Sequence, residues 1–141
     1  DITEGVGYML GIIATGHGNF ATGMVSAVNL LAGGNPCVIP VDFEGTESEE
    51  TLQRHLREAV DQLADCSSIL FLTDILGGSP FKNAAVIKSA MENCSVLYGI
   101  NLAMLVECVM RAQFPEQYEG NGWEESVRDI LKSGMEMAGV F

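Results

Sequence analysis

The chain has 141 residues, of which 48% are hydrophobic and 18% are charged, a balance that excludes a wholly disordered protein. Seven basic and 19 acidic residues give a formal net charge of −12. Such a surface repels phosphate backbones and anionic lipids, which argues against nucleic acid and membrane surfaces as partners and suits a basic protein.

The first third of the chain alternates short apolar runs with a stretch of helical periodicity. After a loose terminus at residues 1–7, residues 8–14 predict a buried strand. A helix is predicted over about 20–31 and ends at a Gly-Gly-Asn-Pro turn. Residues 37–41 predict a second strand. Pro40 places this strand at an edge of the sheet because proline cannot donate a ladder hydrogen bond.

The same alternation continues to the end of the chain. Thr46 and Glu49 have capping-box spacing and predict the start of a second helix, whose apolar stripe is Leu52, Leu56, Val60 and Leu63. Residues 68–73 are nearly all apolar and predict a central third strand. The remaining predicted elements are a helix over about 81–92, a strand over 95–99, a helix over about 102–113 capped by Asn101, a loop over 114–122 and a helix over about 123–137.

Four successive strand–helix pairs are typical of an α/β fold with a parallel sheet. We expect a doubly wound, mainly parallel four-stranded sheet in the order 2-1-3-4, with helices on both faces. No composition shift, repeat or low-complexity tract interrupts the pattern, so residues 1–141 are predicted to form a single domain.

The cysteines favour a reducing compartment. Cys37, Cys66, Cys94 and Cys108 lie in or beside apolar segments and form no CxxC pair or His cluster, so we expect small core side chains and no metal site. No cofactor is expected either. The N-terminal residues lack a basic segment before an apolar stretch, and no run is long enough for a membrane span. A cytoplasmic location is therefore predicted.

Two strand-end loops carry the candidate chemistry. His17 follows the first strand between Gly16 and Gly18, and Asp74 follows the third strand. In doubly wound sheets, sites form at the carboxyl ends of strands where the strand order reverses. Strands one and three are neighbours in the predicted order, so His17 and Asp74 are expected to meet. A histidine that donates Nδ1–H to a carboxylate keeps Nε2 available as a nucleophile.

The loop after Asp74 predicts a cradle for an anion. Gly77 and Gly78 precede Ser79, a good N-cap, and Pro80, a good first helical residue. The amides and hydroxyl at this helix start would hold a phosphoryl group at the positive end of the helix dipole. Gly18, at the start of the first helix, would contribute likewise.

Each of these features also has a purely structural interpretation. His17 can be incidental, Asp74 can accept local turn amides, and Gly77 to Pro80 can be only a turn and a helix start. His55, flanking the apolar stripe of the second helix, is interpreted as a solvated helix-face residue rather than a catalytic one.

An alternative hypothesis is that the chain is a small dinucleotide-binding domain. Residues 16–21, Gly-His-Gly-Asn-Phe-Ala, fit the G-x-G-x-x-A variant of the dinucleotide fingerprint, and Asp42 would contact a ribose. In that reading the loop that contains Asp74 has no assigned role.

Three segments resemble the IIA component of mannose-family sugar phosphotransferase systems. They are residues 11–21, 71–81 and 99–107, and they contain Thr-Gly-His-Gly-Asn-Phe-Ala and Thr-Asp-Ile-Leu-Gly-Gly-Ser-Pro. The resemblance implies a phosphoryl carrier with a doubly wound parallel sheet. By the same resemblance, His17 is the phosphoryl acceptor at Nε2, Asp74 is the carboxylate that orients it, and Ser79 lies near the phosphoryl group.

The resemblance also implies partners. Such a component takes the phosphoryl group from HPr and passes it to a IIB component, which serves the membrane subunits IIC and IID during sugar uptake. Homodimers are implied, with a C-terminal segment exchanged as a fifth, antiparallel strand; residues 138–141 are the candidate here. The run from Thr15 to Met24 is most similar to the N-acetylgalactosamine or galactosamine branch.

Overall fold

The computed structural model describes residues 9–118, 120 and 122–141. The predicted loose terminus and the first residue of the first predicted strand lie outside these residues. The helices and strands are β1 (Leu10–His17), α2 (Phe20–Ala32), β2 (Val38–Phe43), α3 (Glu49–Gln62), β3 (Ser68–Thr73), α4 (Ser79–Lys88), β4 (Cys94–Leu97), α5 (Leu102–Gln113), the 3-10 helix η1 (Pro115–Tyr118) and α6 (Trp123–Glu136).

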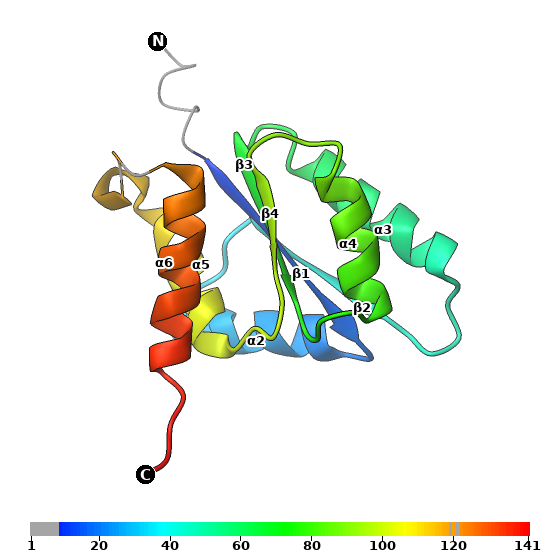
Figure 1. The fold of residues 1–141 in the computed structure, drawn as a ribbon, viewed down its shortest axis with the longest axis horizontal. Helices are drawn as coiled ribbons and strands as arrows, with labels where there is room; N and C mark the ends of the chain where they lie inside the picture. Colours follow the sequence, from blue (N-terminus) through cyan, green and yellow to red (C-terminus); the bar gives the residue numbers. More distant parts are fainter. Residues whose placement is uncertain (1–8, 119, 121) are drawn as a thin grey trace.

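The strands form one parallel sheet in the predicted order β2-β1-β3-β4. β2 is an edge strand, as Pro40 predicted, and β1 and β3 are the two central strands. Figure 1 shows α5 and α6 on one side of the sheet and α3 and α4 on the other. Because the strands are parallel, β1 and β3 end side by side at one edge of the sheet.

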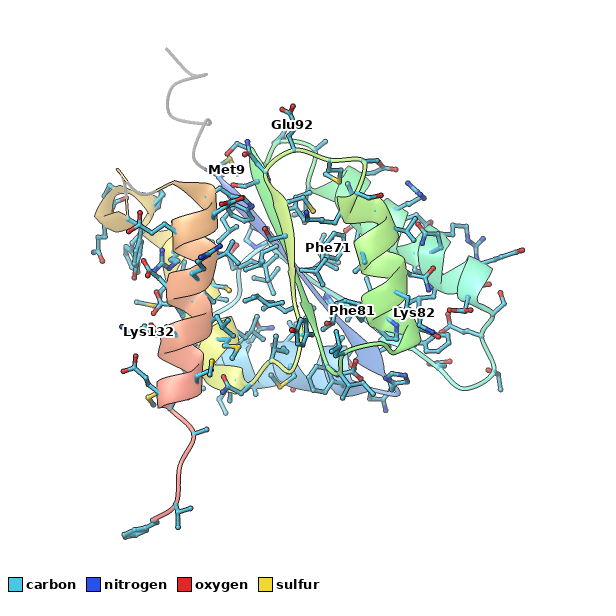
Figure 2. All side chains as sticks on the ribbon, viewed as in Figure 1. Met9, Phe71, Phe81, Lys82, Glu92 and Lys132 are labelled. Atoms are coloured by element: carbon cyan, nitrogen blue, oxygen red, sulfur yellow. The ribbon has the colours of Figure 1, made fainter. Side chains whose placement is uncertain are left out.

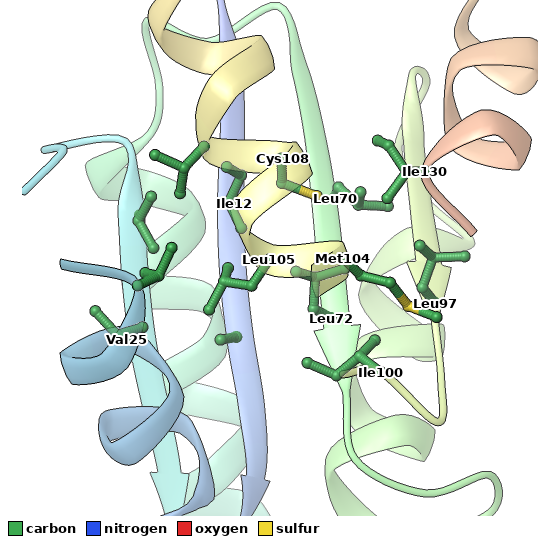
Figure 3. Close-up of a cluster of buried hydrophobic side chains, with 14 of the residues drawn as sticks. Ile12, Val25, Leu70, Leu72, Leu97, Ile100, Met104, Leu105, Cys108 and Ile130 are labelled. Carbon is green, nitrogen blue, oxygen red and sulfur yellow. The ribbon is translucent and has the colours of Figure 1, made fainter. Parts of the chain in front are cut away.

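The sheet separates two apolar clusters. On one face, Ile12 of β1 and Leu70 of β3 meet Val28 of α2, Leu105 of α5 and Ile130 of α6 (Figure 3). On the other face, β1 and β3 pack against α3 and α4, and Phe71 lies between the sheet and α4 (Figure 2). Burial on both faces explains why β1 and β3 read as nearly continuous apolar runs.

Several element boundaries differ from the predictions. The N-cap of α3 is Ser48, which accepts a hydrogen bond from the Thr51 amide, so the predicted capping box at Thr46 and Glu49 is wrong. The predicted loop over 114–122 contains η1. β1 extends to His17 rather than ending at residue 14.

The C-terminal residues 138–141 form neither helix nor strand, and their trace leaves the body of the protein beyond α6 (Figure 1). The side chains of Val140 and Phe141 are fully exposed. Within the described part of the chain, no helix is both long and apolar enough to span a membrane.

Candidate functional site

The site lies at the carboxyl edge of the sheet. His17 is the last residue of β1, and Asp74 follows β3 directly. The register pairs Thr15 of β1 with Thr73 of β3, so the two strand ends lie at the same height. The loops that carry His17 and Asp74 therefore leave neighbouring strands side by side, as the sequence predicted.

Asp74 holds His17 at two points. Oδ2 of Asp74 lies 2.6 Å from Nδ1 of the imidazole and accepts a 2.8 Å hydrogen bond from the His17 backbone amide. The other carboxylate oxygen, Oδ1, accepts a 2.8 Å hydrogen bond from the Ile75 amide. The Asp74 side chain is 12% exposed, whereas that of His17 is 47% exposed. The imidazole is thus fixed at one nitrogen and open to solvent elsewhere.

This arrangement fixes the tautomer of His17. Burial acts to raise the pKa of Asp74, but hydrogen bonds from the His17 backbone and ring and from the Ile75 backbone outweigh it, and the pKa lies below its ordinary value. An ionised carboxylate only accepts hydrogen bonds, so Nδ1 carries a proton. In the neutral ring Nε2 then holds the lone pair, which is the electronic requirement for a nucleophile.

Two glycines make room for this geometry. A Cβ at Gly78 would lie 2.7 Å from Cε1 and 3.3 Å from Nε2 of His17. A Cβ at Gly16 would lie 2.5 Å from the Phe20 ring and 3.0 Å from the Asp74 carboxyl carbon. From the sequence, Gly77 and Gly78 were expected to help hold an anion. The structure shows that Gly16 and Gly78 are required by the packing of the site itself.

The imidazole lies against the start of α4. Gly78 is the N-cap of this helix and Ser79 is its first residue, so the predicted N-cap role of Ser79 is wrong. Gly77 adopts φ +84°, a left-handed conformation suited to glycine. The first amides of a helix have no intrahelical partners and sit at the positive end of its dipole. Nε2 of His17 therefore lies beside the N-terminus of α4, a position that favours an anion.

Gly18 does not contribute its amide to this place. Its N–H donates a 2.8 Å hydrogen bond to the carbonyl of Phe43, and its φ is +59°. The ring of Phe43 also meets that of His17 edge to face, with centroids 6.0 Å apart. Sequence reasoning missed Phe43 because it ended the second strand at residue 41, whereas the ladder continues and pairs Phe43 with His17.

Asp42 is engaged in capping rather than facing a ligand. Its carboxylate accepts hydrogen bonds of 3.0 Å from the Thr22 amide and 2.8 Å from the Thr22 hydroxyl, in the first turn of α2. The Asn19 side chain makes no capping bond to that helix, so Asp42 caps α2 from the neighbouring strand. The carboxylate that the dinucleotide reading assigned to a ribose is thus used within the fold.

The second histidine lies away from the site. His55 of α3 is 3.4 Å from Glu47, and its side chain is 40% exposed, which agrees with a helix-face residue. Cys94 and Cys108 are buried, and burial raises the pKa of Cys94 to about 11. The described residues contain no group of three or more His, Cys, Asp or Glu side chains placed to hold a metal ion.

The sequence matches the family described as "PTS system fructose IIA component" (EIIA-man) over residues 11–120, which is more than half of the chain. The chain belongs to the EIIA-man family. The match contains both strand-end loops of the site. The protein is therefore a IIA component of a sugar phosphotransferase system, of the mannose family that the sequence resembled.

Individual relatives agree with this membership. The fructose-specific EIIA component of Bacillus subtilis (strain 168) is 30% identical over 99 residues, which cover 70% of this chain and 68% of that protein. The mannose-specific EIIAB component of Escherichia coli (strain K12) is 34% identical over 101 residues, 72% of this chain and 31% of that protein, so this chain spans about a third of its length. The structure of EIIA from Streptococcus agalactiae is 30% identical, with a TM-score of 0.80, and the match covers 94% of this chain and 98% of that one.

Proposed function

We propose that this IIA component accepts a phosphoryl group from HPr on Nε2 of His17 and passes it to a histidine of a IIB component. The observation that carries the proposal is the 2.6 Å contact between Nδ1 of His17 and Asp74, with the other edge of the imidazole at the start of α4. One nitrogen is held and protonated, and the other is left as a nucleophile beside a place that favours negative charge.

The phosphoryl transfer forms one N–P bond and breaks another, so it needs no cofactor. The Nε2 lone pair attacks the phosphorus of the donor phosphohistidine, the new N–P bond forms, and the donor N–P bond breaks and returns its electron pair to the donor ring. The imidazole of His17 becomes cationic, and the Asp74 carboxylate stabilises it through Nδ1–H. The amides at Gly78 and Ser79 and the Ser79 hydroxyl would face the phosphoryl oxygens. The next transfer reverses these roles.

The other expectations of the family resemblance belong to this proposal. The chain would act as one domain over residues 1–141, work in the cytoplasm, and reach the membrane subunits IIC and IID only through IIB. The similarity of the run from Thr15 to Met24 to the N-acetylgalactosamine branch favours an amino sugar. The relatives reported above are named for fructose and mannose.

A homodimer is also part of the proposal. Exposed apolar side chains gather where α2, α5 and α6 come together, and Leu31, Met110 and Met137 line one groove there. Contiguous exposed apolar surface of this kind commonly marks an interface. The extended residues 138–141 begin beside that groove and would pair with the sheet edge of a second copy.

The decisive experiment is phosphorylation in a reconstituted system. The protein is incubated with phosphoenolpyruvate, enzyme I and HPr, and the label is mapped under conditions that preserve phosphohistidine. We expect His17 to carry all of it, His17→Ala to stay unlabelled, and His55→Ala to label like the wild type. Label on His55, or full labelling of His17→Ala, would refute the proposal. Tight binding of NAD or NADP by an unlabelled protein would instead support the dinucleotide reading.

A further inference from the structure

Two half-buried cysteines lie together at the amino edge of the sheet, the edge opposite His17. Cys37 directly precedes β2, and Cys66 lies in the connection between α3 and β3. Both are free, and both pack against the apolar cluster beneath α3 and α4. About six residues of β1, or roughly 20 Å of strand, separate this edge from the phosphorylation site proposed above.

Gly11 of β1 is a common neighbour of the two cysteines. Ile12 pairs with Val38 and its amide donates a 2.8 Å hydrogen bond to the Cys37 carbonyl, so Gly11 lies beside Cys37 in the ladder. A Cβ at Gly11 would lie 3.2 Å from Sγ and 3.3 Å from Cβ of Cys66. Together with Cδ1 of Leu63, which would lie 2.9 Å from that Cβ, the Cys66 side chain leaves no room for a side chain at position 11.

The two thiols lie on either side of Gly11 and are close enough to affect the pKa of Cys66. Burial raises the pKa of Cys66 to about 11, and the charge of Cys37 and a hydrogen bond between the two side chains act in the same direction. Cys66 is thus protonated at neutral pH and is a poor first nucleophile, because the thiolate is the reactive form.

We propose that Cys37 and Cys66 form a reversible disulfide when the protein meets a low-molecular-weight disulfide. The Cys37 thiolate attacks one sulfur of that disulfide, forms a mixed disulfide and expels one small thiolate. The Cys66 thiolate then attacks the Cys37 sulfur, forms the Cys37–Cys66 bond and expels the second small thiolate. Two protein thiols are oxidised, and one small disulfide is reduced to two thiols.

The cross-link would tie the start of β2 to the start of β3 across β1. It closes a loop that contains β2 and α3, so it restricts the unfolded chain and raises Tm. Phosphoryl acceptance by His17 should stay unchanged because the cross-link lies at the other edge of the sheet. The inference concerns a site apart from His17 and does not depend on the proposed function.

The test uses the full reduced chain and oxidised glutathione as the probe. After incubation under native conditions, free thiols are alkylated, and intact mass and a non-reducing peptide map are measured. After subtraction of any alkyl groups, we expect a mass two hydrogens below that of the reduced protein, with no alkyl group on Cys37 or Cys66 and one linked peptide pair that contains both. A persistent glutathione adduct, a link through Cys94 or Cys108, or no reaction would overturn the proposal.

Variants separate the two steps. Cys66→Ser should retain glutathione on Cys37, because the resolving thiol is gone. Cys37→Ser should acquire glutathione at Cys66 at least about tenfold more slowly than Cys66→Ser acquires it at Cys37, since the attacking thiolate is scarce. Cys94→Ala, the buried control, should form the cross-link like the wild type. Equal glutathionylation rates in the two serine variants would contradict the assigned order, and the wild-type map decides the link itself if a variant fails to fold.

Discussion

A single carboxylate oxygen, Oδ2 of Asp74, receives both the backbone amide and the ring Nδ1 of His17. Oδ1 is occupied as well, by the Ile75 amide. All three bonds require an acceptor, so no neutral amide side chain can satisfy them: an asparagine would turn its NH2 group toward at least one N–H donor. A neutral amide at position 74 would therefore remove the negative charge and also one of the hydrogen-bond acceptors.

We predict that Asp74→Asn slows phosphoryl transfer to His17 by about 10²–10⁴-fold. The imidazole loses the acceptor that fixes its tautomer and the charge that stabilises its cationic form. The forced donor–donor contact should also lower the free energy of unfolding by about 1–3 kcal/mol. Single-turnover transfer from phosphorylated HPr measures the first effect, and urea unfolding measures the second.

Asp42→Asn is the matched control because it removes the same charge near the site. An asparagine at position 42 can accept from the Thr22 amide and donate to the Thr22 hydroxyl, so both capping contacts survive. Transfer should stay at the wild-type rate, with a stability loss of about 0.3–1 kcal/mol from the helix dipole. Equal slowing in both asparagine variants would show that general charge, rather than the Asp74 contact, controls the rate.

The contact between His17 and Asp74 should make the stability of the protein depend on pH. The pKa of Asp74 is lowered in the folded protein, so its stabilising contribution is fully present above the ordinary carboxyl pKa of 3.8 and is lost as pH falls through the lower folded value. The stability difference between the wild type and Asp74→Asn should therefore be constant near neutral pH and shrink below about pH 4. A difference that grows on acidification would contradict the lowered pKa.

Gly78 gives a second prediction at the residue scale. Gly78→Ala would bring a methyl group to 2.7 Å from Cε1 of His17 and displace the imidazole from the start of α4. We expect transfer to fall by at least about tenfold while the fold persists, since alanine at an N-cap costs about 1 kcal/mol or less relative to glycine. Gly23→Ala, inside α2 with nothing near its Cβ position, should gain about 0.5–1 kcal/mol and transfer normally. Wild-type transfer by Gly78→Ala would refute the steric role.

At the scale of elements, the turn over residues 44–47 determines the residue at which α3 begins. The Glu47 side chain accepts from the Glu44 amide and the Glu47 amide donates to the Glu44 carbonyl, so residues 44–47 close a turn before the helix starts. Ser48, the next residue, is free to cap the helix. Thr46 has the same capping chemistry, but it lies inside the turn.

Ser48→Ala should lower the free energy of unfolding by about 1 kcal/mol, because the Thr51 amide loses its acceptor. Thr46→Ala, which removes a hydroxyl of the same kind two residues earlier, should change stability by less than about 0.5 kcal/mol. Urea unfolding of the two variants measures the difference. A loss of stability confined to Thr46→Ala would restore the cap that the sequence predicted.

The strands show what sequence can and cannot predict. The buried centres of β1 and β3 were predictable because burial on both faces selects continuous apolar runs. The end of β1 was not, since Thr15, Gly16 and His17 look polar, yet their backbones stay paired with Val41, Asp42 and Phe43. The contact between His17 and Asp74 followed from strand order alone. Gly16 and Gly78 are needed because side chains from other loops and helices pack against them. Residue spacing in the sequence does not reveal those contacts.

At the scale of the whole molecule, the ends of α2 and α6 leave apolar side chains uncovered. Leu30 and Leu31 at the end of α2, and Met135 and Met137 at the end of α6, are largely exposed. The last four residues extend away from the same end of α6 (Figure 1). Both features belong to the surface through which we propose that two copies associate.

We predict that the full chain sediments as a dimer, and that a chain ending at Glu136 dimerises at least about tenfold more weakly. The truncation removes Val140 and Phe141, whose fully exposed apolar side chains would be buried in the dimer. Sedimentation equilibrium of both chains measures the two constants. A monomeric full chain refutes the dimer, and an equally tight truncated dimer refutes the exchange of the C-terminal segment.

The double hold of Asp74 on His17 has a kinetic consequence. An imidazole tied by its ring to the acceptor of its own backbone amide cannot swing outward to meet a partner. In the proposed function, every protein that exchanges a phosphoryl group with His17 must approach the same open edge of the ring. Donor and acceptor would then exclude each other, so we expect each to inhibit the other competitively, and steady-state flux to pass through a maximum as either one is raised at a fixed amount of the other.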